Sequence, residues 1–312
     1  MTELEEKTRK AIERLKAFEP PEGYYLAFSG GKDSVVCKAL CDMAGVKYDA
    51  HYRLTSVDPP ELVRFIREVH PDVEIEKPRY SDRIKDESLR GKQITMWNLI
   101  RSKRIMPTRI ARFCCSSLKE SGGDGRMTIT GVRWAESTNR ENNQGVVTLM
   151  RKKLPAEIME SGDFLQTPKG GVVLTNDNEE SRRMIEQCYK RSKTTLNPII
   201  DWSDRNVWDF IHENNVPYCS LYDEGFERLG CIGCPMGRRK NRERDFARYP
   251  TYKKMYLKCI EYLLEDAKKR GVNWGERLYG EGYEATAEDY FNWWMEYDVL
   301  PNQMTFDEVD TF

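Results

Sequence analysis

The sequence lacks the features of a membrane protein, a secreted protein or a strongly charged protein. No apolar run approaches the length of a membrane span, and the first residues, Met-Thr-Glu-Leu-Glu-Glu-Lys, are charged rather than signal-like. An excess of charge of one sign is also missing, because 50 basic and 51 acidic residues give a formal net charge of −1. A protein coated with positive charge is therefore excluded, and any basic patch must be local. We expect a cytoplasmic protein with no membrane partner.

Histidine is scarce, with three residues, whereas cysteine is abundant, with nine. In a cytoplasmic setting, this cysteine count argues against a disulfide framework and for metal binding, redox chemistry or buried thiols. The 312 residues suffice for one large domain or two ordinary ones, each with a sizeable core. Internal repeats and low-complexity linkers are absent from the sequence.

The most informative stretch is a strand, a glycine turn and a helix. The pattern predicts a short buried strand at Tyr24–Phe28, a turn at Gly30 and Gly31, and a helix over Ser34–Ala44 that Gly45 ends. Such a turn is an anion site, because the free N–H groups and the positive end of the helix dipole point at it. The spacing differs from that of a Walker A loop. It predicts phosphate binding, and the alternative is a turn that only joins strand to helix.

The side chains of this turn add donors for a phosphate. Ser29 and Ser34 offer hydroxyl groups, and Lys32 offers a positive charge. Gly30 and Gly31 allow the backbone to approach the ligand closely. Asp33 would bind Mg²⁺ or orient the loop.

Strand and helix patterns alternate from residue 24 to residue 130, which predicts an α/β fold with a doubly wound, mostly parallel sheet. The other expected helices are 2–18, 60–69, 94–103, 204–213, 250–270 and 287–297, and the other expected strands are 46–54, 73–75 and 127–130. Ligands of such sheets bind at the carboxyl ends of the strands. This places the glycine turn and Thr55 on one rim.

The chain divides by pattern into two parts. Residues 1–202 are expected to form a nucleotide-binding α/β domain, in which the irregular stretch 141–180 is an inserted hairpin and loop. Residues 203–312 are expected to be mainly helical.

Four cysteines stand out by their spacing. Cys114 and Cys115 are adjacent and precede a short predicted helix, and Cys231-x-x-Cys234 lies beside glycines, as in a metal knuckle. Four thiolates suit Zn²⁺ or a [4Fe–4S] cluster. Adjacent cysteines reach two irons of a cluster more easily than one tetrahedral ion, so a cluster is favoured over zinc and over unliganded thiols. Four further cysteines lie in helical patterns and are expected to be small buried hydrophobes or idle thiols: Cys37, Cys41, Cys188 and Cys259.

Arginines follow a predicted strand end and precede the cysteine pair. Arg133 and Arg140 suit bidentate binding of phosphate or sulfate, and Arg109 and Arg112 approach the same rim. The alternative is a set of surface salt bridges. A basic run at 238–242 follows the knuckle and would suit an anionic acceptor, such as nucleic acid.

The segment Ser-Gly-Gly-Lys-Asp-Ser resembles the pyrophosphate loop of the adenine-nucleotide alpha hydrolases, which include N-type ATP pyrophosphatases and phosphoadenosine phosphosulfate (PAPS) reductases. The resemblance covers most of residues 24–240 and implies a HUP or Rossmann-like fold. The four cysteines look like the Cys-Cys…Cys-x-x-Cys set of iron–sulfur adenylyl-sulfate reductases.

This resemblance implies a set of site residues. Lys32, Asp33, Arg133 and Arg140 would be catalytic. The nucleotide would be held by Ser29, Gly30, Gly31, Lys32, Asp33, Ser34, Thr55, Arg109, Arg112, Glu136 and Ser137. A [4Fe–4S] cluster, or zinc as the alternative, would be held by Cys114, Cys115, Cys231 and Cys234. The nucleotide would be ATP, adenylyl sulfate or PAPS, with Mg²⁺ as a further candidate.

One departure affects the expected reaction. Sulfonucleotide reductases of this family use a cysteine in a Glu-Cys-Gly-x-His motif, whereas the last cysteine here is Cys259. Related iron–sulfur proteins of DNA phosphorothioation and tRNA thiolation split ATP to AMP and pyrophosphate and transfer sulfur. We therefore expect an ATP-pyrophosphatase-type sulfur transferase, served by a cysteine desulfurase or a thioredoxin-like donor. The alternatives are a sulfonucleotide reductase that makes sulfite and a non-catalytic nucleotide-binding subunit. Homo-oligomer formation stays open.

Overall fold

The computed structural model describes residues 1–123, 125–149, 164–167, 172–174 and 194–297. The chain forms two compact units that interleave along the sequence. Unit 1 comprises Met1–Arg53, Pro60–Glu76 and Ser121–Leu229, and unit 2 comprises Leu54–Pro59, Lys77–Glu120 and Gly230–Phe312. This division differs from a boundary after residue 202, because 203–229 join unit 1 and 77–120 join unit 2.

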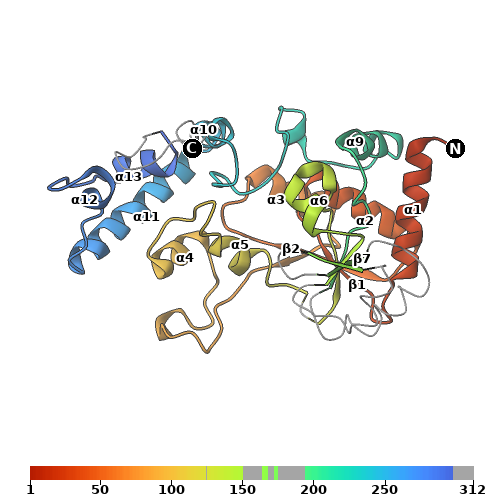
Figure 1. Cartoon of the computed structure of the whole chain (residues 1–312), viewed down its shortest axis with the longest axis horizontal. Coiled ribbons are helices and arrows are strands. Elements are labelled where there is room, and N and C mark those ends of the chain that lie inside the picture. The colour runs from red at the N-terminus through yellow and green to blue at the C-terminus, as the bar shows by residue number, and fades with distance from the viewer. Residues whose placement is uncertain (124, 150–163, 168–171, 175–193, 298–312) are drawn as a thin grey trace. The chain divides into compact units, whose positions relative to one another are not determined.

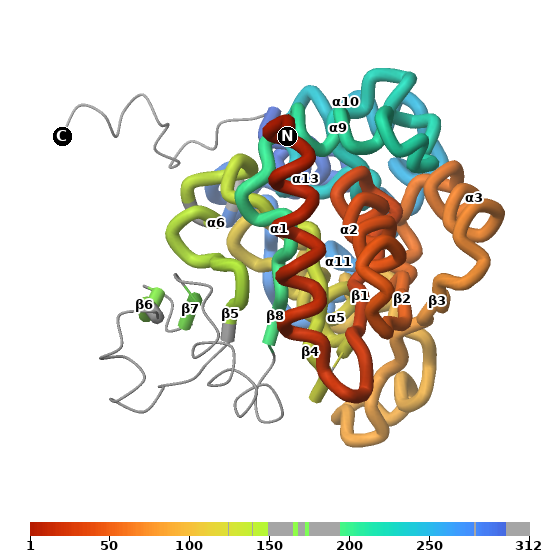
Figure 2. Tube along the Cα trace, turned by 90° about the vertical axis from the view of Figure 1, so that its right-hand side faces the viewer, coloured from red at the N-terminus to blue at the C-terminus, as the bar shows by residue number. Residues whose placement is uncertain are grey.

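Unit 1 is built on one sheet with the strand order β3-β2-β1-β4-β8-β5-β7-β6, which can be followed across Figure 2. Its strands are β1 (Tyr24–Ala27), β2 (Tyr48–Arg53), β3 (Glu74–Glu76), β4 (Met127–Ile129), β5 (Val147–Leu149), β6 (Phe164–Gln166), β7 (Val172–Leu174) and β8 (Thr194–Leu196). Strands β3, β2, β1, β4 and β8 pair in parallel. The expected α/β fold with a mostly parallel sheet is confirmed.

The stretch expected as an inserted hairpin extends this same sheet. Strand β5 pairs antiparallel with β8 and β7, and β6 pairs antiparallel with β7. Residues 150–163, 168–171 and 175–180, and Cys188 with them, lie outside the described residues.

The helices of unit 1 begin and end at the signals in the sequence. They are α1 (Glu3–Ala17), α2 (Lys32–Ala44), α3 (Pro60–Val69), α6 (Thr138–Asn143) and α9 (Asp204–Glu213), with 3₁₀ turns η2 (Trp134–Glu136) and η4 (Ser220–Tyr222). Thr2 and Glu5 form a capping box at the start of α1, and Gly45 ends α2 at φ +67°. Helix α1 packs against α2 and α9 (Figure 1).

Asp201, just before α9, holds α1 in unit 1 through hydrogen bonds. Its carboxylate accepts hydrogen bonds from both terminal nitrogens of Arg14, at 2.8 and 3.2 Å, and its carbonyl accepts one from Lys7 Nζ at 2.7 Å. The contact joins the first helix to a segment far along the chain.

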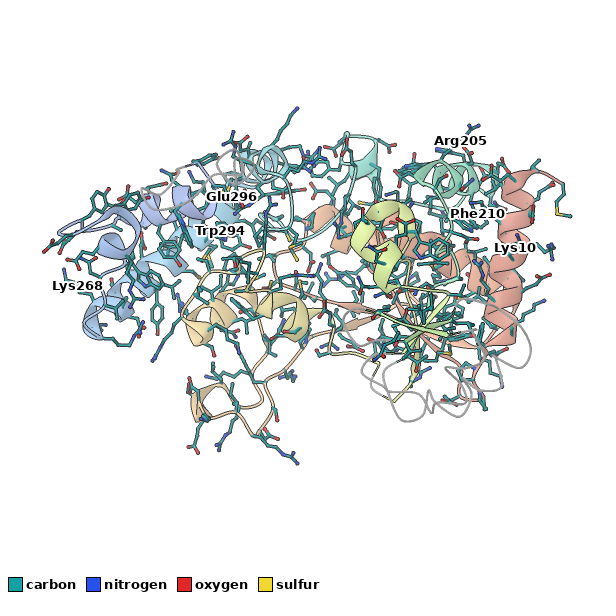
Figure 3. The ribbon with its side chains drawn as sticks, in the orientation of Figure 1. Lys10, Arg205, Phe210, Lys268, Trp294 and Glu296 are labelled. Carbon is teal, nitrogen blue, oxygen red and sulfur yellow. The ribbon has the colours of Figure 1, made fainter. Side chains whose placement is uncertain are left out.

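Unit 2 is mainly helical. Its helices are η1 (Glu87–Leu89), α4 (Met96–Lys103), α5 (Phe113–Leu118), α10 (Arg239–Arg248), α11 (Pro250–Lys269), α12 (Trp274–Tyr279) and α13 (Ala287–Trp294). Helix α11 packs against α4, α10 and α13, and Tyr256 on it contacts the rings of Trp97, Phe246 and Trp294. Figure 3 labels Trp294 on α13. Across the described residues, none of the helices combines the length and the apolar character that crossing a bilayer requires.

Candidate functional site

The glycine turn of unit 1 is stabilised by hydrogen bonds of its own side chains. Ser34 Oγ accepts a hydrogen bond from Ser29 N at 3.2 Å and donates one to the carbonyl of Gly31 at 2.8 Å. Gly30 lies at φ +72°, and a Cβ there would come within 2.6 Å of Leu62 Cδ1. Glycine is therefore required at residue 30 both by conformation and by space.

Lys32, the first residue of α2, carries a buried positive charge directly after this turn. Its side chain is 8% exposed, and Nζ lies 3.3 Å from Asp204 Oδ1 and 3.8 Å from Asp33 Oδ2. The ammonium is thus held in a fixed place by two carboxylates. A cation positioned beside a helix N-terminus is suited to stabilising a phosphate.

Arg133 follows the end of β4, as its sequence context predicts, and carboxylates surround its guanidinium. Its side chain is 2% exposed, Nε donates to Asp33 Oδ1 at 2.7 Å, and Nη2 donates to Asp204 Oδ1 at 2.6 Å. Nη1 donates to the carbonyl of Trp202 at 3.3 Å. Since these acceptors occupy the guanidinium, Arg133 positions the two carboxylates that hold Lys32 rather than presenting a free fork to phosphate. Asp33, the second residue of α2, is held by the same contact.

Asp204 is a functional candidate that sequence reasoning missed. It is the first residue of α9 and accepts from both Arg133 and Lys32. Burial alone would raise the pKa of Asp204, but the hydrogen bond from Arg133 and the charges of Lys32 and Arg133 hold it below its ordinary value. Its only sequence signal is its place directly after the Ser203 helix cap.

Tyr222 is a second residue that the sequence did not point to. Its Oη accepts a hydrogen bond from Lys32 N at 2.9 Å. This backbone N–H belongs to the first residue of α2, where a phosphate oxygen would bind. The Tyr222 ring packs edge-on against Trp208, with centroids 5.1 Å apart.

Glu136, Ser137 and Arg140 form a local capping structure. Ser137 Oγ accepts from Arg140 N at 3.3 Å and caps α6. Glu136 accepts from Arg133 N at 3.1 Å and forms an ion pair with Arg140. The three residues therefore lie together, as the sequence predicts, with the Arg140 guanidinium engaged by a carboxylate.

The four singled-out cysteines all belong to unit 2. Cys114 and Cys115 lie in the first turn of α5, so the helix begins before them rather than after them. Cys231 and Cys234 flank a turn in which Cys234 N donates to the carbonyl of Cys231 at 3.1 Å, with Gly233 at φ +70°. Ile232 N donates to the carbonyl of Val57 at 2.8 Å, which fixes this turn against the segment of Thr55.

The thiols of α5 interact with one another and with Arg112. A hydrogen bond from Cys114 and one from Arg112 lower the pKa of Cys115 to about 6, and the bond between the two cysteines raises the pKa of Cys114. Arg112 Nη2 lies 3.6 Å from Cys115 Sγ. Arg112 is thus placed beside a thiolate, and thiolates are the species that bind metals.

Lys119, which sequence reasoning also missed, lies beside the knuckle. The negative charge of Cys231 raises the pKa of Lys119 against the opposing effect of burial, and Asp58 and Cys234 act in the same direction. Cys231 Sγ also lies 3.5 Å from Thr55 Oγ1. Thr55 is therefore a neighbour of the thiols.

Arg109 is paired with a carboxylate. Its Nε lies 3.3 Å from Glu296 Oε1, and both side chains are about half exposed. Both Arg109 and Arg112 belong to unit 2, whereas the glycine turn belongs to unit 1.

The arrangement of the four thiols indicates which kind of metal group they could hold. Charges of Cys115, Cys231 and Cys234 all raise the pKa of Cys114, so the four thiols share one electrostatic neighbourhood. Nevertheless, no group of three or more His, Cys, Asp or Glu side chains in the described part of the chain is gathered to hold a single metal ion. The donor set fits a group that takes one thiolate per iron better than an ion that gathers four sulfurs about one point.

The other described cysteines are buried. Cys37, Cys41, Cys219 and Cys259 are all 0–1% exposed. This confirms the prediction of buried small residues for Cys37, Cys41 and Cys259, and Cys219, left unassigned by its pattern, is buried as well.

Comparisons with known proteins find a matching family model and several similar proteins. The family model described as phosphoadenosine phosphosulfate reductase domain matches residues 23–236. Two uncharacterized proteins of Methanocaldococcus jannaschii are 25% identical over 263 and 286 residues, which is 80% and 89% of this chain. The chain spans 43% and 56% of these relatives, about half of their length. A crystal structure of phosphoadenylyl-sulfate (PAPS) reductase from Candida auris has a TM-score of 0.39 at 16% identity, covering 74% of this chain and 96% of that one.

Proposed function

Because this chain belongs to the phosphoadenosine phosphosulfate reductase domain family, we propose that it is an ATP-pyrophosphatase-type enzyme that activates an acceptor for sulfur transfer. The family is one of adenine-nucleotide alpha hydrolases, which include ATP pyrophosphatases and sulfonucleotide reductases. We propose both which of these activities the chain has and which residues carry it out.

The observation that carries the proposal is the arrangement at the start of α2. A closed glycine turn, the N-terminus of a thirteen-residue helix and the buried ammonium of Lys32 converge there. Such a site binds the charge of a pyrophosphate leaving group, because donors and cation are already in place before the reaction. The roles proposed for Ser29, Gly30, Gly31, Lys32 and Ser34 follow from this arrangement.

In the proposed reaction, an oxygen of the acceptor attacks the α-phosphorus of ATP. The bond from that phosphorus to the bridging oxygen breaks, pyrophosphate leaves with the electron pair, and the acceptor becomes adenylated. Lys32 stabilises the charge that grows on the leaving group, while Arg133 and Asp204 keep Lys32 in place. A persulfide sulfur of a separate donor protein then attacks the adenylated atom of the acceptor and displaces AMP, which leaves acceptor and donor joined by a disulfide. A second thiol of the donor breaks this S–S bond, forms a disulfide within the donor and leaves the sulfur on the acceptor. Mg²⁺ would accompany the phosphates.

Cys114, Cys115, Cys231 and Cys234 are proposed to hold a [4Fe–4S] cluster. When bound, such a cluster would supply sulfur coordination or electron transfer to this chemistry. Zinc is the less favoured alternative, because two adjacent cysteines reach two irons of a cluster more easily than one tetrahedral ion.

The acceptor is proposed to be anionic. Arg238, Arg239 and Lys240 are exposed at the start of α10, directly after the knuckle. Exposed basic side chains of this kind bind phosphate groups, such as those of nucleic acid. The Arg109–Glu296 pair beside them limits how much free charge Arg109 adds.

The second candidate function is reduction of adenylyl sulfate or PAPS to sulfite. The low pKa of Cys115 favours it, because a thiolate is the nucleophile that such a reaction needs. A third candidate is nucleotide binding without turnover, within a larger complex.

The experiment is anaerobic incubation of purified protein with ATP, adenylyl sulfate or PAPS, followed by product analysis. AMP and pyrophosphate from ATP support the proposed activity. Thiol-dependent sulfite from a sulfonucleotide would replace it with the reductase, and tight binding without any product would leave only the binding role. Lys32→Ala is the control for products formed by contaminants.

A further inference from the structure

A buried arginine of unit 2 lacks partners for part of its guanidinium. Arg242, on α10, is 1% exposed. Its Nη1 donates to the carbonyl of Trp294 at 2.9 Å, and the guanidinium lies 4.3 Å above the Trp294 ring. Within the part of the chain that the structure describes, Nε and Nη2 have no hydrogen-bond partner. Buried polar atoms of a charged group are rarely left in this state.

Helix α10 supports the knuckle directly. Gly233 N donates to Asp245 Oδ2 at 3.2 Å, and a Cβ at Gly233 would come within 2.3 Å of the Phe246 ring. A Cβ at Gly237 would lie 3.8 Å from Arg242 Cγ, and Gly237 N donates to the carbonyl of Cys234 at 2.9 Å. The stem of Arg242 therefore lies against the turn that begins at Cys234.

The charges around Arg242 indicate what its free N–H groups face. Glu296, labelled in Figure 3, lies just beyond α13, but its carboxylate is half exposed and paired with Arg109. Burial lowers the pKa of Arg242, whereas the charges of Glu296 and Cys234 oppose that effect. Cys234 is thus the proposed metal ligand whose charge acts on Arg242, while Lys119 lies near both Cys231 and Cys234.

We propose that Arg242 compensates the negative charge at Cys234, with Nε and Nη2 donating to the thiolate or to the metal group that Cys234 holds. The inference rests on the metal group of the proposed function. It gives the buried guanidinium of Arg242 a partner at the proposed ligand whose turn the Arg242 stem contacts. The competing explanation is that Arg242 only anchors α13 through Trp294.

The two explanations differ in a comparison of metal-free and metal-loaded protein. Removing an uncompensated buried charge costs a metal-free protein little, because the charge itself is expensive to bury. Removing it from the loaded protein leaves the negative charge of the metal group without its partner. Residues that support metal ligands in this way change metal affinity by about 10- to 100-fold.

The test uses Arg242→Met and Arg242→Lys, with Lys240→Met as the control for charge removal at an exposed position of the same helix. All are reconstituted anaerobically with iron and sulfide. The measurements are the thermal midpoint of the metal-free protein and the rate at which a chelator removes the metal. We expect Arg242→Met to keep the metal-free midpoint and to lose metal about tenfold faster, with Arg242→Lys between it and wild type. Lys240→Met should behave as wild type.

An unchanged rate of metal loss in Arg242→Met, together with a lower metal-free midpoint, would overturn the inference in favour of the anchor. If Arg242→Met does not fold, a wild-type rate of metal loss in Arg242→Lys and a lowered metal-free midpoint would overturn it equally. Wild-type protein that takes up no metal would instead contradict the proposed metal group itself, which separates the two failures.

Discussion

At the scale of single residues, the candidate nucleotide site depends on charges that hold one another. Lys32, Asp33, Arg133 and Asp204 form one network of two cations and two carboxylates inside unit 1. Lys32 directly follows the glycine turn. Asp33 and Asp204 hold its ammonium, and Arg133 in turn holds these two carboxylates. The catalytic role expected for Arg133 is therefore reassigned to positioning.

Replacing Lys32 tests this division of roles. Lys32→Ala should weaken nucleotide binding by about 2 kcal/mol, roughly 30-fold, because a charge-assisted contact to phosphate is lost. Isothermal titration with ATP measures the change. Lys10→Ala, at an exposed position on α1, is the matched control. Equal affinity of folded Lys32→Ala and wild type would remove Lys32 from the site.

Replacing Tyr222 should have the opposite effect and strengthen phosphate binding. Its hydroxyl must leave Lys32 N before a phosphate oxygen can accept from that N–H. Tyr222→Phe removes this competition, and the hydrogen bond given up is worth about 1 kcal/mol. Pyrophosphate should thus bind about fivefold more tightly to Tyr222→Phe. Weaker binding would show that the hydroxyl itself contacts the phosphate.

The two glycines of the turn should respond differently to alanine. Gly30→Ala should lower the free energy of unfolding by about 1–3 kcal/mol or more, because φ is +72° and Leu62 fills the space. Gly31 has φ −79°, and a Cβ there would have contacts of 3.4 Å, so Gly31→Ala should fold normally. Chemical denaturation of both variants measures this. A stable Gly30→Ala would contradict the description of the turn.

Sequence reasoning finds such residues only in part. The turn, Lys32 and the knuckle were predictable, because their chemistry lies within a few neighbouring residues. The bonds from Arg133 to Asp33 and Asp204 were not, because they join residues 100 and 71 positions apart. Tyr222 and Lys119 escaped for the same reason, since no local pattern marks a residue that meets its partner only in the folded chain.

At the scale of elements, capping signals located the helices well. The boxes of Thr2 with Glu5, Ser203 with Asn206 and Thr286 with Asp289 mark the starts of α1, α9 and α13. The prediction was wrong at α5, where the helix includes the cysteine pair. The prediction was also incomplete at 141–180, where β5 pairs with β8 and extends the sheet. The sequence of a strand does not by itself specify which other strand it pairs with.

Docking of α1 gives a prediction about pH. Burial alone would raise the pKa of Asp201, but Arg14 outweighs it and holds the pKa below the ordinary value of 3.8. A lowered pKa in the folded state means that the stabilisation is present above the unfolded pKa and is lost as pH falls through the folded one.

We therefore expect Asp201→Asn to cost about 2 kcal/mol of unfolding free energy at neutral pH. The difference from wild type should shrink only below about pH 4, where wild-type Asp201 becomes protonated. Urea denaturation at several pH values measures it. A difference that is constant down to the lowest pH would show that the charge of Asp201 plays no part.

At the scale of the whole molecule, the interleaving of the units makes a prediction about the metal. All four proposed ligands belong to unit 2, although they come from distant parts of the chain. A metal group that joins them would stabilise that unit and leave the sheet of unit 1 unaffected. Metal removal should thus speed hydrogen exchange in α5, α10 and α11 while the strands of unit 1 keep their protection. Equal loss of protection in both units would contradict the assignment of the ligands to one unit.

The central claim is that the site at the start of α2 splits ATP between its α- and β-phosphates. The most direct measurement is chromatographic analysis of the nucleotides formed from ATP and Mg²⁺ under anaerobic conditions, with acceptor and sulfur donor supplied from a fractionated extract. The account predicts AMP and pyrophosphate in equal amounts, and neither from Lys32→Ala. Formation of ADP and phosphate by wild-type protein, or AMP formation that Lys32→Ala retains, would contradict it.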